Sequence, residues 1–170
     1  RNALNWPAVA RLLDDSPHVR KIALHAVAEQ RIEYLADQLI ARLQQNENPQ
    51  HRRDYADTLA RIVRKTQPWP YWGFRPAPRP AATVDWERTA AIEKALNSGL
   101  LDSNYDIRVF VLSRMLREGI VPEIPLLVDW LSEETSEQRV NAILESLKTR
   151  DDGVIQPILV QTALRSDLTD

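Results

Sequence analysis

The chain has 170 residues, which is enough for one domain with its own hydrophobic core. Apolar residues make up 44% of it, which excludes disorder by composition, and a net charge of -2 gives no overall attraction to nucleic acid or to an anionic membrane. Cysteine is absent, so disulfides, thiolate metal sites and cysteine nucleophiles are excluded as well.

The chain begins at Arg1 with neither an initiator methionine nor a signal sequence, and we expect it to be a piece of a longer protein. No run of residues reaches the ~18 consecutive apolar side chains that a membrane span needs. The sequence therefore predicts no membrane span.

The first part of the chain predicts four helices, because apolar side chains recur at the spacing of one helix face. A helix covers about 6–13, the next begins with Ser16 as its cap and Pro17 in its first turn, a third covers about 32–45, and a fourth begins at Asn48 and Pro49. For the second helix we expect an inner face made of Val19, Ile22, Ala23, Ala26 and Val27. The stripes of the third and fourth carry Leu35, Leu39, Ile40 and Leu43, and then Tyr55, Leu59, Ile62 and Val63.

The helical pattern stops at about 67–84, where five prolines remove backbone donors and fix the backbone. Four aromatic side chains lie between the prolines, so we expect this irregular loop to be ordered and packed against the helical body. It is also the best candidate binding site, because Trp, Tyr and Arg dominate protein interfaces and aromatic faces stack on sugars. The candidate residues are Trp69, Tyr71, Trp72, Phe74, Arg75 and Arg79.

Helical spacing resumes at Asp85 and Trp86, with Gly99 as the predicted C-cap. Four further helices are predicted over 106–118, stopped by Gly119, and over 124–131, 135–147 and 153–164. These complete a prediction of nine helices, which pair mostly as antiparallel hairpins. Strand signals are weak along the whole chain.

One phrase recurs along the chain, in which a Leu-Asp pair leads through a polar turn to an aliphatic-Arg pair and then to a second aliphatic residue. It runs from Leu13 to Leu24 and from Leu101 to Leu112, and a looser copy runs from Leu131 to Ile143. Recurrence of a helix-turn-helix phrase is typical of stacked helical repeats that share one core.

The aspartates of this phrase are placed to cap helices, and we expect its arginines to bond to neighbouring aspartates as a ladder between repeats. The ladder residues are Asp15, Arg20, Asp102, Arg108 and Arg139. The sequence thus predicts an all-α protein in which residues 1–170 form a single HEAT-like α-solenoid domain of antiparallel helix pairs, with one long ordered loop.

Residues 13–66 and 86–164 resemble HEAT-type α-solenoids, through Asp15, Val19-Arg20 and Leu24, and through Asp102, Ile107-Arg108 and Leu112, with Arg139 and Ile143 as a weaker copy. The segment 69–80, followed by Trp86-Glu87-Arg88-Thr89, is less ordinary. It resembles a segment of large multidomain haem proteins of planctomycete-type and verrucomicrobial bacteria.

Proteins of that family are typically exported, and they join a sugar-dehydrogenase-like β-propeller, a HEAT region and a c-type haem domain with a Cys-x-x-Cys-His motif. The resemblance implies that this chain is the HEAT region alone, exported or periplasmic, and in contact with neighbouring domains. Because it has no cysteine, it cannot attach haem in that way. We expect no cofactor in it, and any oxidoreductase activity would belong to the rest of the parent protein.

A second basic feature is the stretch of Arg52, Arg53, Arg61, Arg64 and Lys65, which helical spacing places on neighbouring rows. HEAT-like DNA glycosylases use such basic faces together with aromatic residues. The overall negative charge and the interleaved acids at 54 and 57 favour a solvated or ion-paired helix face over nucleic-acid binding.

The remaining polar residues indicate no catalytic or metal chemistry. His18 and His25 are seven residues apart on one helix, and His51 lies near a helix start. The paired acids in turns fit capping and helix-dipole interactions, and no calcium loop, phosphate loop or serine elbow occurs. We therefore expect a non-catalytic scaffold or spacer module that makes protein contacts, with a carbohydrate-contacting loop and a nucleic-acid protein or DNA glycosylase as the alternatives.

Overall fold

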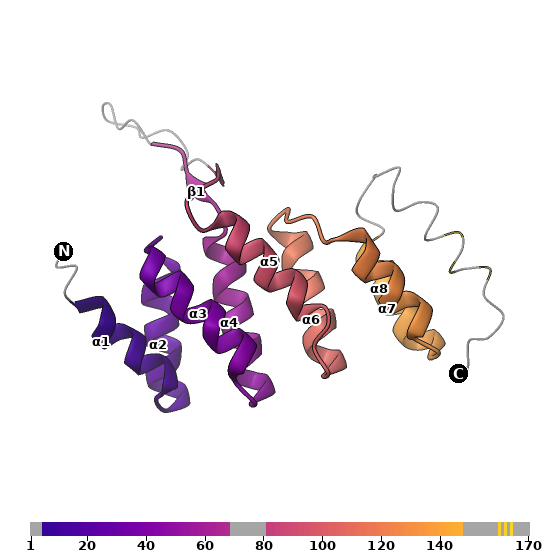
Figure 1. Cartoon of the computed structure of the whole chain (residues 1–170), viewed down its shortest axis with the longest axis horizontal. Coiled ribbons are helices and arrows are strands. Elements are labelled where there is room, and N and C mark those ends of the chain that lie inside the picture. Colours follow the sequence, from indigo (N-terminus) through magenta and orange to yellow (C-terminus); the bar gives the residue numbers. More distant parts are fainter. Residues whose placement is uncertain (1–4, 69–80, 148–159, 161, 163, 165–170) are drawn as a thin grey trace, which may run out of the picture. The chain divides into compact units, whose positions relative to one another are not determined.

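The computed structural model describes residues 5–68, 81–147, 160, 162 and 164. Within these residues the chain forms eight α-helices, one 3-10 turn and two short strands, so the protein is all-α, as the sequence predicts (Figure 1). The helices are α1 (Trp6–Arg11), α2 (Pro17–Ala28), α3 (Glu33–Gln45), α4 (Pro49–Ile62), α5 (Thr89–Gly99), α6 (Tyr105–Arg117), α7 (Ile124–Glu133) and α8 (Glu137–Leu147). The predicted last helix, 153–164, lies almost entirely outside the described residues.

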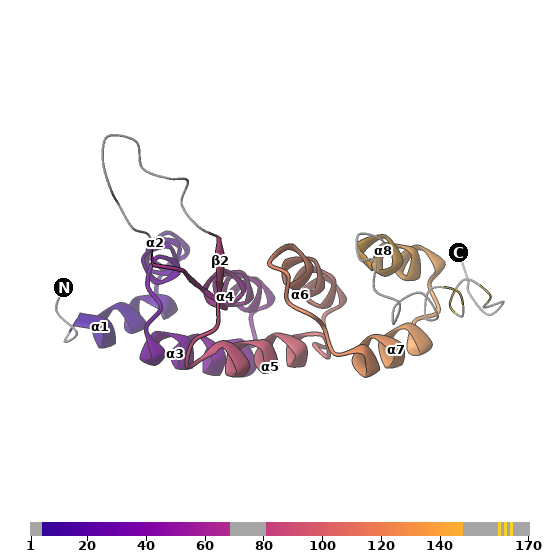
Figure 2. The same ribbon diagram turned by 90° about the horizontal axis from the view of Figure 1, so that it is seen from above.

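The chain divides into two compact units, Arg1–Ala95 and Leu96–Asp170, and the boundary falls within α5. In the first unit α2 and α4 lie side by side in one layer, and α1 and α3 lie in the other (Figure 2). Between the layers are side chains with no exposed surface, among them Leu13, Leu35, Leu39, Tyr55, Leu59 and Ile62. The Tyr55 hydroxyl donates to the main-chain oxygen of Leu13 at 3.0 Å, which ties α4 to the 3-10 turn Leu12–Asp14 after α1.

The buried faces of α3 and α4 match their predicted stripes, except that Ile40 is only half-buried. The predicted inner face of α2 is wrong at two positions, because Ile22 is 58% exposed and Ala26 is exposed. The buried stripe is instead Arg20, Ala23, Leu24 and Val27. The apolar pattern predicts that Ile22 is buried. The fold buries Arg20 instead, and its guanidinium contacts the main-chain oxygen of Asp15 and the carboxylate of Asp54.

Helix starts follow the predicted caps in part. Asn48 accepts a hydrogen bond from the amide of Gln50 at 2.9 Å, as predicted. Asn104, which was not predicted as a cap, accepts one from the amide of Asp106 at 3.0 Å. Ser16 stands at the N-cap of α2 as predicted, but its hydroxyl makes no capping bond. The carboxylate of Asp15 instead accepts a hydrogen bond from the amide of Ser16, at 2.6 Å.

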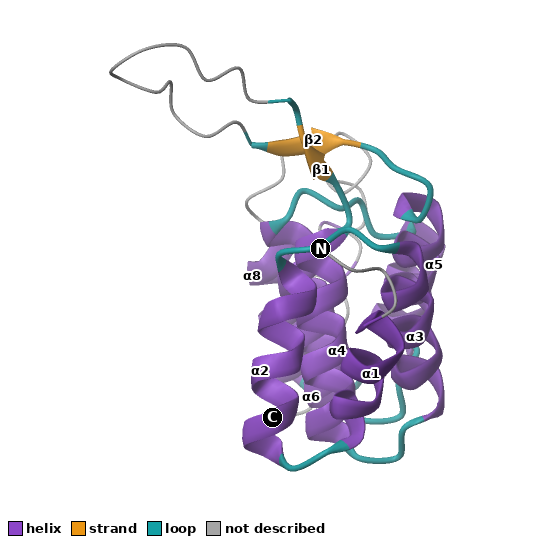
Figure 3. Ribbon diagram, turned by 90° about the vertical axis from the view of Figure 1, so that its left-hand side faces the viewer, coloured by secondary structure: helices purple, strands orange, loops and turns teal. Residues whose placement is uncertain are grey.

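Two short strands, which the sequence did not predict, flank the proline-rich loop. β1 (Lys65–Thr66) and β2 (Ala82–Val84) pair antiparallel, with Lys65 opposite Val84 and Thr66 opposite Ala82. This ladder lies beyond the ends of the helices of the first unit (Figure 3). The residues called irregular at 82–84 are therefore a strand, and α5 begins at Thr89 rather than at Trp86.

In the second unit α6 packs against α8, and its core includes Leu100, Ile107, Leu112, Met115, Ile120, Leu127 and Ile143. Gly119 ends α6 as predicted, with a left-handed φ of 67° that favours glycine. Helix α5 ends at Gly99, the glycine predicted to end it, although Gly99 has no positive φ. A Cβ there would lie 3.3 Å from the Cγ2 of Val111, so Gly99 lets α6 approach α5 closely.

Candidate functional site

The six residues predicted to bind through the proline-rich loop lie outside the described residues. They are Trp69, Tyr71, Trp72, Phe74, Arg75 and Arg79. What the structure does describe is the base of this loop, where the chain leaves α4 and returns to α5. The candidate site is therefore built from that base.

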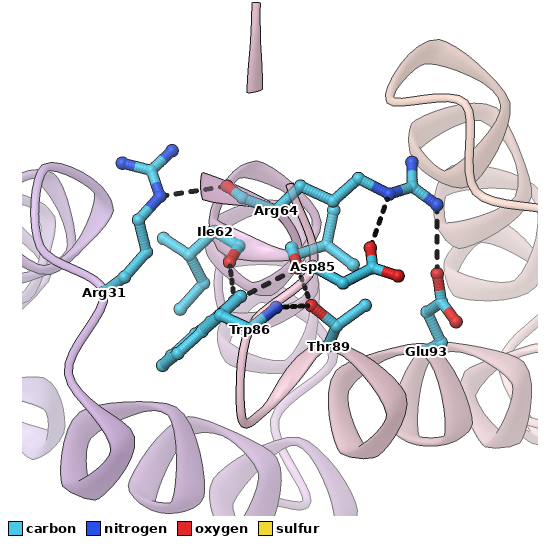
Figure 4. A network of polar contacts seen from close by, with 8 residues as sticks. Arg31, Ile62, Arg64, Asp85, Trp86, Thr89 and Glu93 are labelled. Carbon is cyan, nitrogen blue, oxygen red and sulfur yellow. Dashed lines mark hydrogen bonds and ion pairs between the residues drawn. The ribbon is translucent and has the colours of Figure 1, made fainter. Parts of the chain in front are cut away.

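The returning chain closes the C-terminal end of α4 through Trp86 and Thr89 (Figure 4). The Trp86 indole N–H donates to the main-chain oxygens of Ile62 and Val63, at 2.9 and 3.1 Å. The Thr89 hydroxyl donates to the Val63 oxygen at 2.7 Å and accepts the Trp86 amide at 2.9 Å. Trp86 and Thr89 are 8% and 5% exposed, so these bonds satisfy polar groups that water does not reach freely.

A second set of contacts holds Arg64, where the chain leaves α4 toward the proline-rich loop. Its main-chain oxygen accepts the Nε–H of Arg31 at 3.0 Å, and its own guanidinium contacts Asp85 at 3.3 Å and Glu93 at 3.2 Å (Figure 4). Arg64 thus links α4 to both the chain before α5 and α5 itself. Both ends of the loop are held by side chains far apart in the sequence.

The next residue, Lys65, is also engaged. Its ammonium lies 5.0 Å from the centre of the Trp86 ring and 3.1 Å from a carboxylate oxygen of Glu87. The pKa of Glu87 is held below its usual value by its own backbone amide and by Lys65. Arg88 then contacts Asp37 at 2.8 Å and Glu33 at 3.0 Å on α3, and the hydrogen bond to Asp37 raises the pKa of Arg88.

The basic side chains singled out on and after α4 have partners in the first unit. Arg52 donates to the main-chain oxygens of Asn46 and Glu47, each at 2.9 Å, and Arg61 contacts Asp57 at 3.1 Å. Arg64 and Lys65 are held as described above, and Arg53 is exposed. These cations form ion pairs and helix-end contacts rather than an open basic stripe, which weakens the nucleic-acid alternative.

Two of the predicted ladder arginines share one register. Arg20 and Arg108 each stand four residues after the N-cap residue of their helix, which is Ser16 for α2 and Asn104 for α6. Arg139 stands three residues after Ser136, which directly precedes α8. Sequence reasoning missed a third arginine at the offset of four, Arg52, which follows Asn48. The constant offset from the helix start is the signal that reveals it, whereas the Leu-Asp phrase is absent there.

The contacts of these arginines differ from a simple Asp–Arg ladder. Arg20 donates to the main-chain oxygen of Asp15 at 3.2 Å, five residues back, as Arg52 does to Glu47. Arg139 lies 3.8 Å from the carboxylate of Glu134, also five residues back. Asp102 accepts the amide of Asn104 at 2.8 Å.

One contact does run between helix pairs. The Nε of Arg20, on α2, lies 3.5 Å from Oδ2 of Asp54, on α4. The side chain of Arg20 is 4% exposed and that of Asp54 is 32% exposed, so the pair is largely screened from water. The partner is Asp54, two residues after Arg52, rather than an aspartate of the recurring phrase.

In the second unit, Arg108 meets aromatic rings. Its guanidinium carbon lies 5.0 Å from the centre of the Trp130 ring and 5.8 Å from that of Tyr105. Arg139 lies 4.6 Å from the Tyr105 ring, and the Tyr105 hydroxyl donates to the main-chain oxygen of Arg139 at 3.2 Å. Such cation–π contacts join α6, α7 and α8.

The histidines do not gather into a site. His18 and His25 are exposed on α2, and His51 packs against Tyr55 with 6.3 Å between ring centres. Burial, and to a lesser extent Arg20, lowers the pKa of His51. In the described part of the chain, no group of three metal-ligating side chains occurs.

An open hollow of about 360 Å³ in the first unit is lined by polar residues. Its arginine, Arg42, binds both carboxylate oxygens of Asp14, at 2.9 and 2.6 Å, and the main-chain oxygen of Ala10 at 3.2 Å. The hydrogen bonds that Arg42 donates to the carboxylate of Asp14 raise the pKa of Arg42. These contacts hold α3 against α1 and its 3-10 turn, so the hollow has a structural explanation.

The described helices are all too short or too polar to cross a membrane. The fold and these contacts define the class, an all-α protein with an anchored loop base. Comparison with models of known protein families finds no match, and comparison with curated proteins finds no significant match either.

Proposed function

We propose that the chain is a non-catalytic scaffold or spacer module of a larger exported protein, built as a HEAT-like α-solenoid of antiparallel helix pairs. In this proposal it presents the proline-rich loop for contact with a neighbouring domain or another protein. The observation that carries the proposal is the anchored loop base, where Trp86, Thr89 and Arg64 bind the loop ends to α4 and α5.

The repeat architecture is supported by the register of the arginines. An arginine four residues after the N-cap residue recurs in α2, α4 and α6. Arg20, Arg52 and Arg139 each contact a residue five positions back, in the preceding turn. Within the first unit, two layers of alternating helices share one core. Both features are expected when successive helix pairs are copies of one unit.

The contact role is supported by the side-chain bonds that hold the two ends of the proline-rich loop. A solvated linker needs no buried bonds at its ends, whereas here an indole, a hydroxyl and a guanidinium are committed to the two loop ends. Side-chain bonds of this kind contribute about 0.5–1.5 kcal/mol each. Fixing the ends lowers the entropy that the loop would lose on binding, which favours a loop that presents its Trp, Tyr and Arg residues to a partner.

The proposed identity of the parent protein rests on the sequence resemblance alone. In a multidomain haem protein of the type described above, this chain would hold the propeller and the haem domain in place and would itself carry no cofactor. The full-length gene product tests this part of the proposal directly. A Cys-x-x-Cys-His motif in it would support the parent, and its absence would contradict it.

The contact role is tested by placing the photo-crosslinking residue p-benzoylphenylalanine at Trp72, in the longest natural polypeptide that contains this chain. The matched control places it at Tyr34, which is 42% exposed on α3. We expect crosslinks from position 72 to peptides outside residues 1–170, identified by mass spectrometry. Crosslinks confined to this chain, or no more than at position 34, would overturn the proposal.

Two further titrations of the same chain test the alternative functions, carbohydrate binding and nucleic-acid binding. Saturable binding of a neutral oligosaccharide, lost in Trp72→Ala while the melting temperature is kept, would replace protein contact with carbohydrate contact. Salt-dependent binding of labelled duplex DNA, lost when Arg61 and Arg64 are changed to Gln, would replace it with nucleic-acid binding.

A further inference from the structure

Helix α2 carries an exposed apolar stripe that the sequence predicts to be buried. Ile22 is 58% exposed, Ala26 is exposed and Val19 is half-buried. These residues are three, four and seven positions apart, so they lie along one side of the helix. Single exposed apolar side chains are ordinary on protein surfaces, whereas neighbouring ones mark a contact surface.

The stripe points away from α4. Arg20 lies 3.5 Å from Asp54 on α4, so Arg20 marks the side of α2 that faces α4. Two residues of an α-helix turn the side-chain direction by about 200°, which places Ile22 on the opposite side of α2. Among the described residues of the first unit, α2 and α4 make up this layer of helices (Figure 2). The stripe therefore lies on the outer side of the layer.

The same positions in α4 are packed. Ile22 and Ala26 stand six and ten residues after the N-cap residue of α2, and in α4 the same offsets fall on Asp54 and Thr58. Asp54 contacts α2 through Arg20, and Thr58 is only 4% exposed. Helix α2 thus leaves uncovered the side that is packed in α4. The end of a helical stack normally needs a polar outer face to stay soluble alone, so an apolar one favours further stacking.

The stripe is complementary to a second copy of itself. In an antiparallel pair of α2 helices, Ile22 of each copy lies opposite Ala26 of the other, so a large side chain meets a small one. The same pairing brings His18 of one copy close to Glu29 of the other, which sets an imidazole N–H beside a carboxylate. Both residues are exposed. A parallel pair would instead place the two Glu29 carboxylates against each other, which is unfavourable.

We propose that α2 is a self-association surface through which two copies of this chain form an antiparallel dimer. One helix face is small compared with the about 800 Å² per partner of a stable interface, so the dimer forms and dissociates with concentration. The contact lies on α2, whereas the proline-rich loop is held by α4 and α5. A dimer therefore carries two loops, which raises the apparent affinity for a partner with two binding sites. This last consequence rests on the contact role proposed above, whereas the dimer itself does not.

The test is sedimentation equilibrium of the whole chain at concentrations from about 10 to about 500 µM. We expect the mass to rise from 19.5 kDa toward twice that value. Ile22→Asp and Ala26→Glu should each weaken dimerisation at least about tenfold, because each buries a charge in an apolar contact. Val121→Asp is the matched control, since Val121 is 59% exposed in the second unit, and it should dimerise as the wild type does. Circular dichroism checks that each variant keeps its helices, and Ala26→Glu introduces a good helix former should Ile22→Asp lose them.

A charge exchange tests the antiparallel arrangement. His18→Glu alone should weaken the dimer, because it sets a second carboxylate beside Glu29 of the other copy, and combining it with Glu29→Lys should restore the dimer. Failure of the combined variant to recover would overturn the antiparallel pairing. The proposal as a whole is overturned if the chain stays monomeric at every concentration, which would leave the stripe to a different polypeptide, or if Ile22→Asp and Val121→Asp dimerise alike.

Discussion

Trp86 and Ile62 lie 24 residues apart in the sequence and are joined by a hydrogen bond of 2.9 Å from the indole N–H to the main-chain oxygen. This bond closes the C-terminal end of α4 with a residue from the far side of the proline-rich loop. The same side chain therefore ends a helix and fixes the exit of the loop. The stability of the first unit and the position of the loop are coupled through it.

Trp86→Phe tests this coupling by keeping an aromatic ring and removing the donor. The main-chain oxygen of Ile62 loses its side-chain partner, and the free energy of unfolding is expected to fall by about 1–3 kcal/mol. Urea denaturation followed by circular dichroism measures it. Trp6→Phe is the control, because Trp6 is half-buried on α1 and makes no such bond, and it should change stability by less than about 0.5 kcal/mol. Equal effects of the two substitutions would contradict the role of Trp86.

Thr89→Val removes a hydroxyl of the same network at nearly constant volume. The Trp86 amide loses its acceptor at 2.9 Å and the Val63 oxygen loses a donor at 2.7 Å, in a place that is 5% exposed. We expect a loss of about 1–3 kcal/mol. Thr89→Ser keeps the hydroxyl and should retain most of the stability. A serine variant as unstable as the valine variant would show that packing of the methyl group, rather than the bonds, stabilises the base.

The sequence predicts the helices well where apolar periodicity and caps agree. The stripes of α3 and α4, the Asn48 cap and the Gly119 stop all follow from local chemistry. The predicted face of α2 failed because a buried arginine has partners that no local pattern reveals, namely the Asp15 oxygen and Asp54.

The base of the loop was missed for the same reason. Asp85 and Trp86 were predicted to open a helix, which begins only at Thr89. Trp86 and Thr89 instead bind carbonyl groups at the end of α4 that lie more than 20 residues earlier. The strands that flank the loop are only two and three residues long, which is too short for an alternating pattern to be visible. The base of the loop is held by contacts between residues that are distant in the sequence, and a single sequence does not reveal such contacts.

A double-mutant cycle on Arg20 and Asp54 measures the ion pair that these residues form between α2 and α4. Arg20→Leu and Asp54→Asn, alone and together, are expected to give a coupling energy of about 1–2 kcal/mol, because Arg20 is buried and the pair is poorly screened. The matched control is Arg61 with Asp57 on α4, at 3.1 Å but with the arginine 52% exposed, where about 0.3–0.5 kcal/mol is expected. A coupling no larger than the control would mean that Arg20 acts only through the Asp15 oxygen.

The stability of the protein should fall on acidification because of His51. Burial lowers the pKa of His51 in the folded state, so near pH 6 the unfolded chain, whose histidine has a pKa of about 6.5, binds more protons than the folded one. The contribution is complete above about pH 6.5 and is lost as the pH falls through the lower, folded pKa. His51→Gln should flatten the slope of unfolding free energy between about pH 7.5 and about pH 5.5, which is about one unit on either side of the unfolded pKa. His25→Gln, which keeps His51, should retain the wild-type slope, and an unchanged slope in His51→Gln would contradict the assignment.

Gly119→Ala should destabilise the second unit, because Gly119 holds a left-handed φ of 67° at the end of α6. Its amide donates to the oxygen of Leu116 at 3.1 Å, and the amide of Ile120 donates to that of Met115 at 2.8 Å, so the turn that ends the helix depends on this φ. A Cβ in that conformation costs about 1–2 kcal/mol, which thermal denaturation will show as a lower Tm. Gly119→Asn should lose less, because Asn tolerates the left-handed region. If Ala and Asn are equally well tolerated, the turn can form with another backbone conformation, and the helix end is fixed by burial of Ile120 instead.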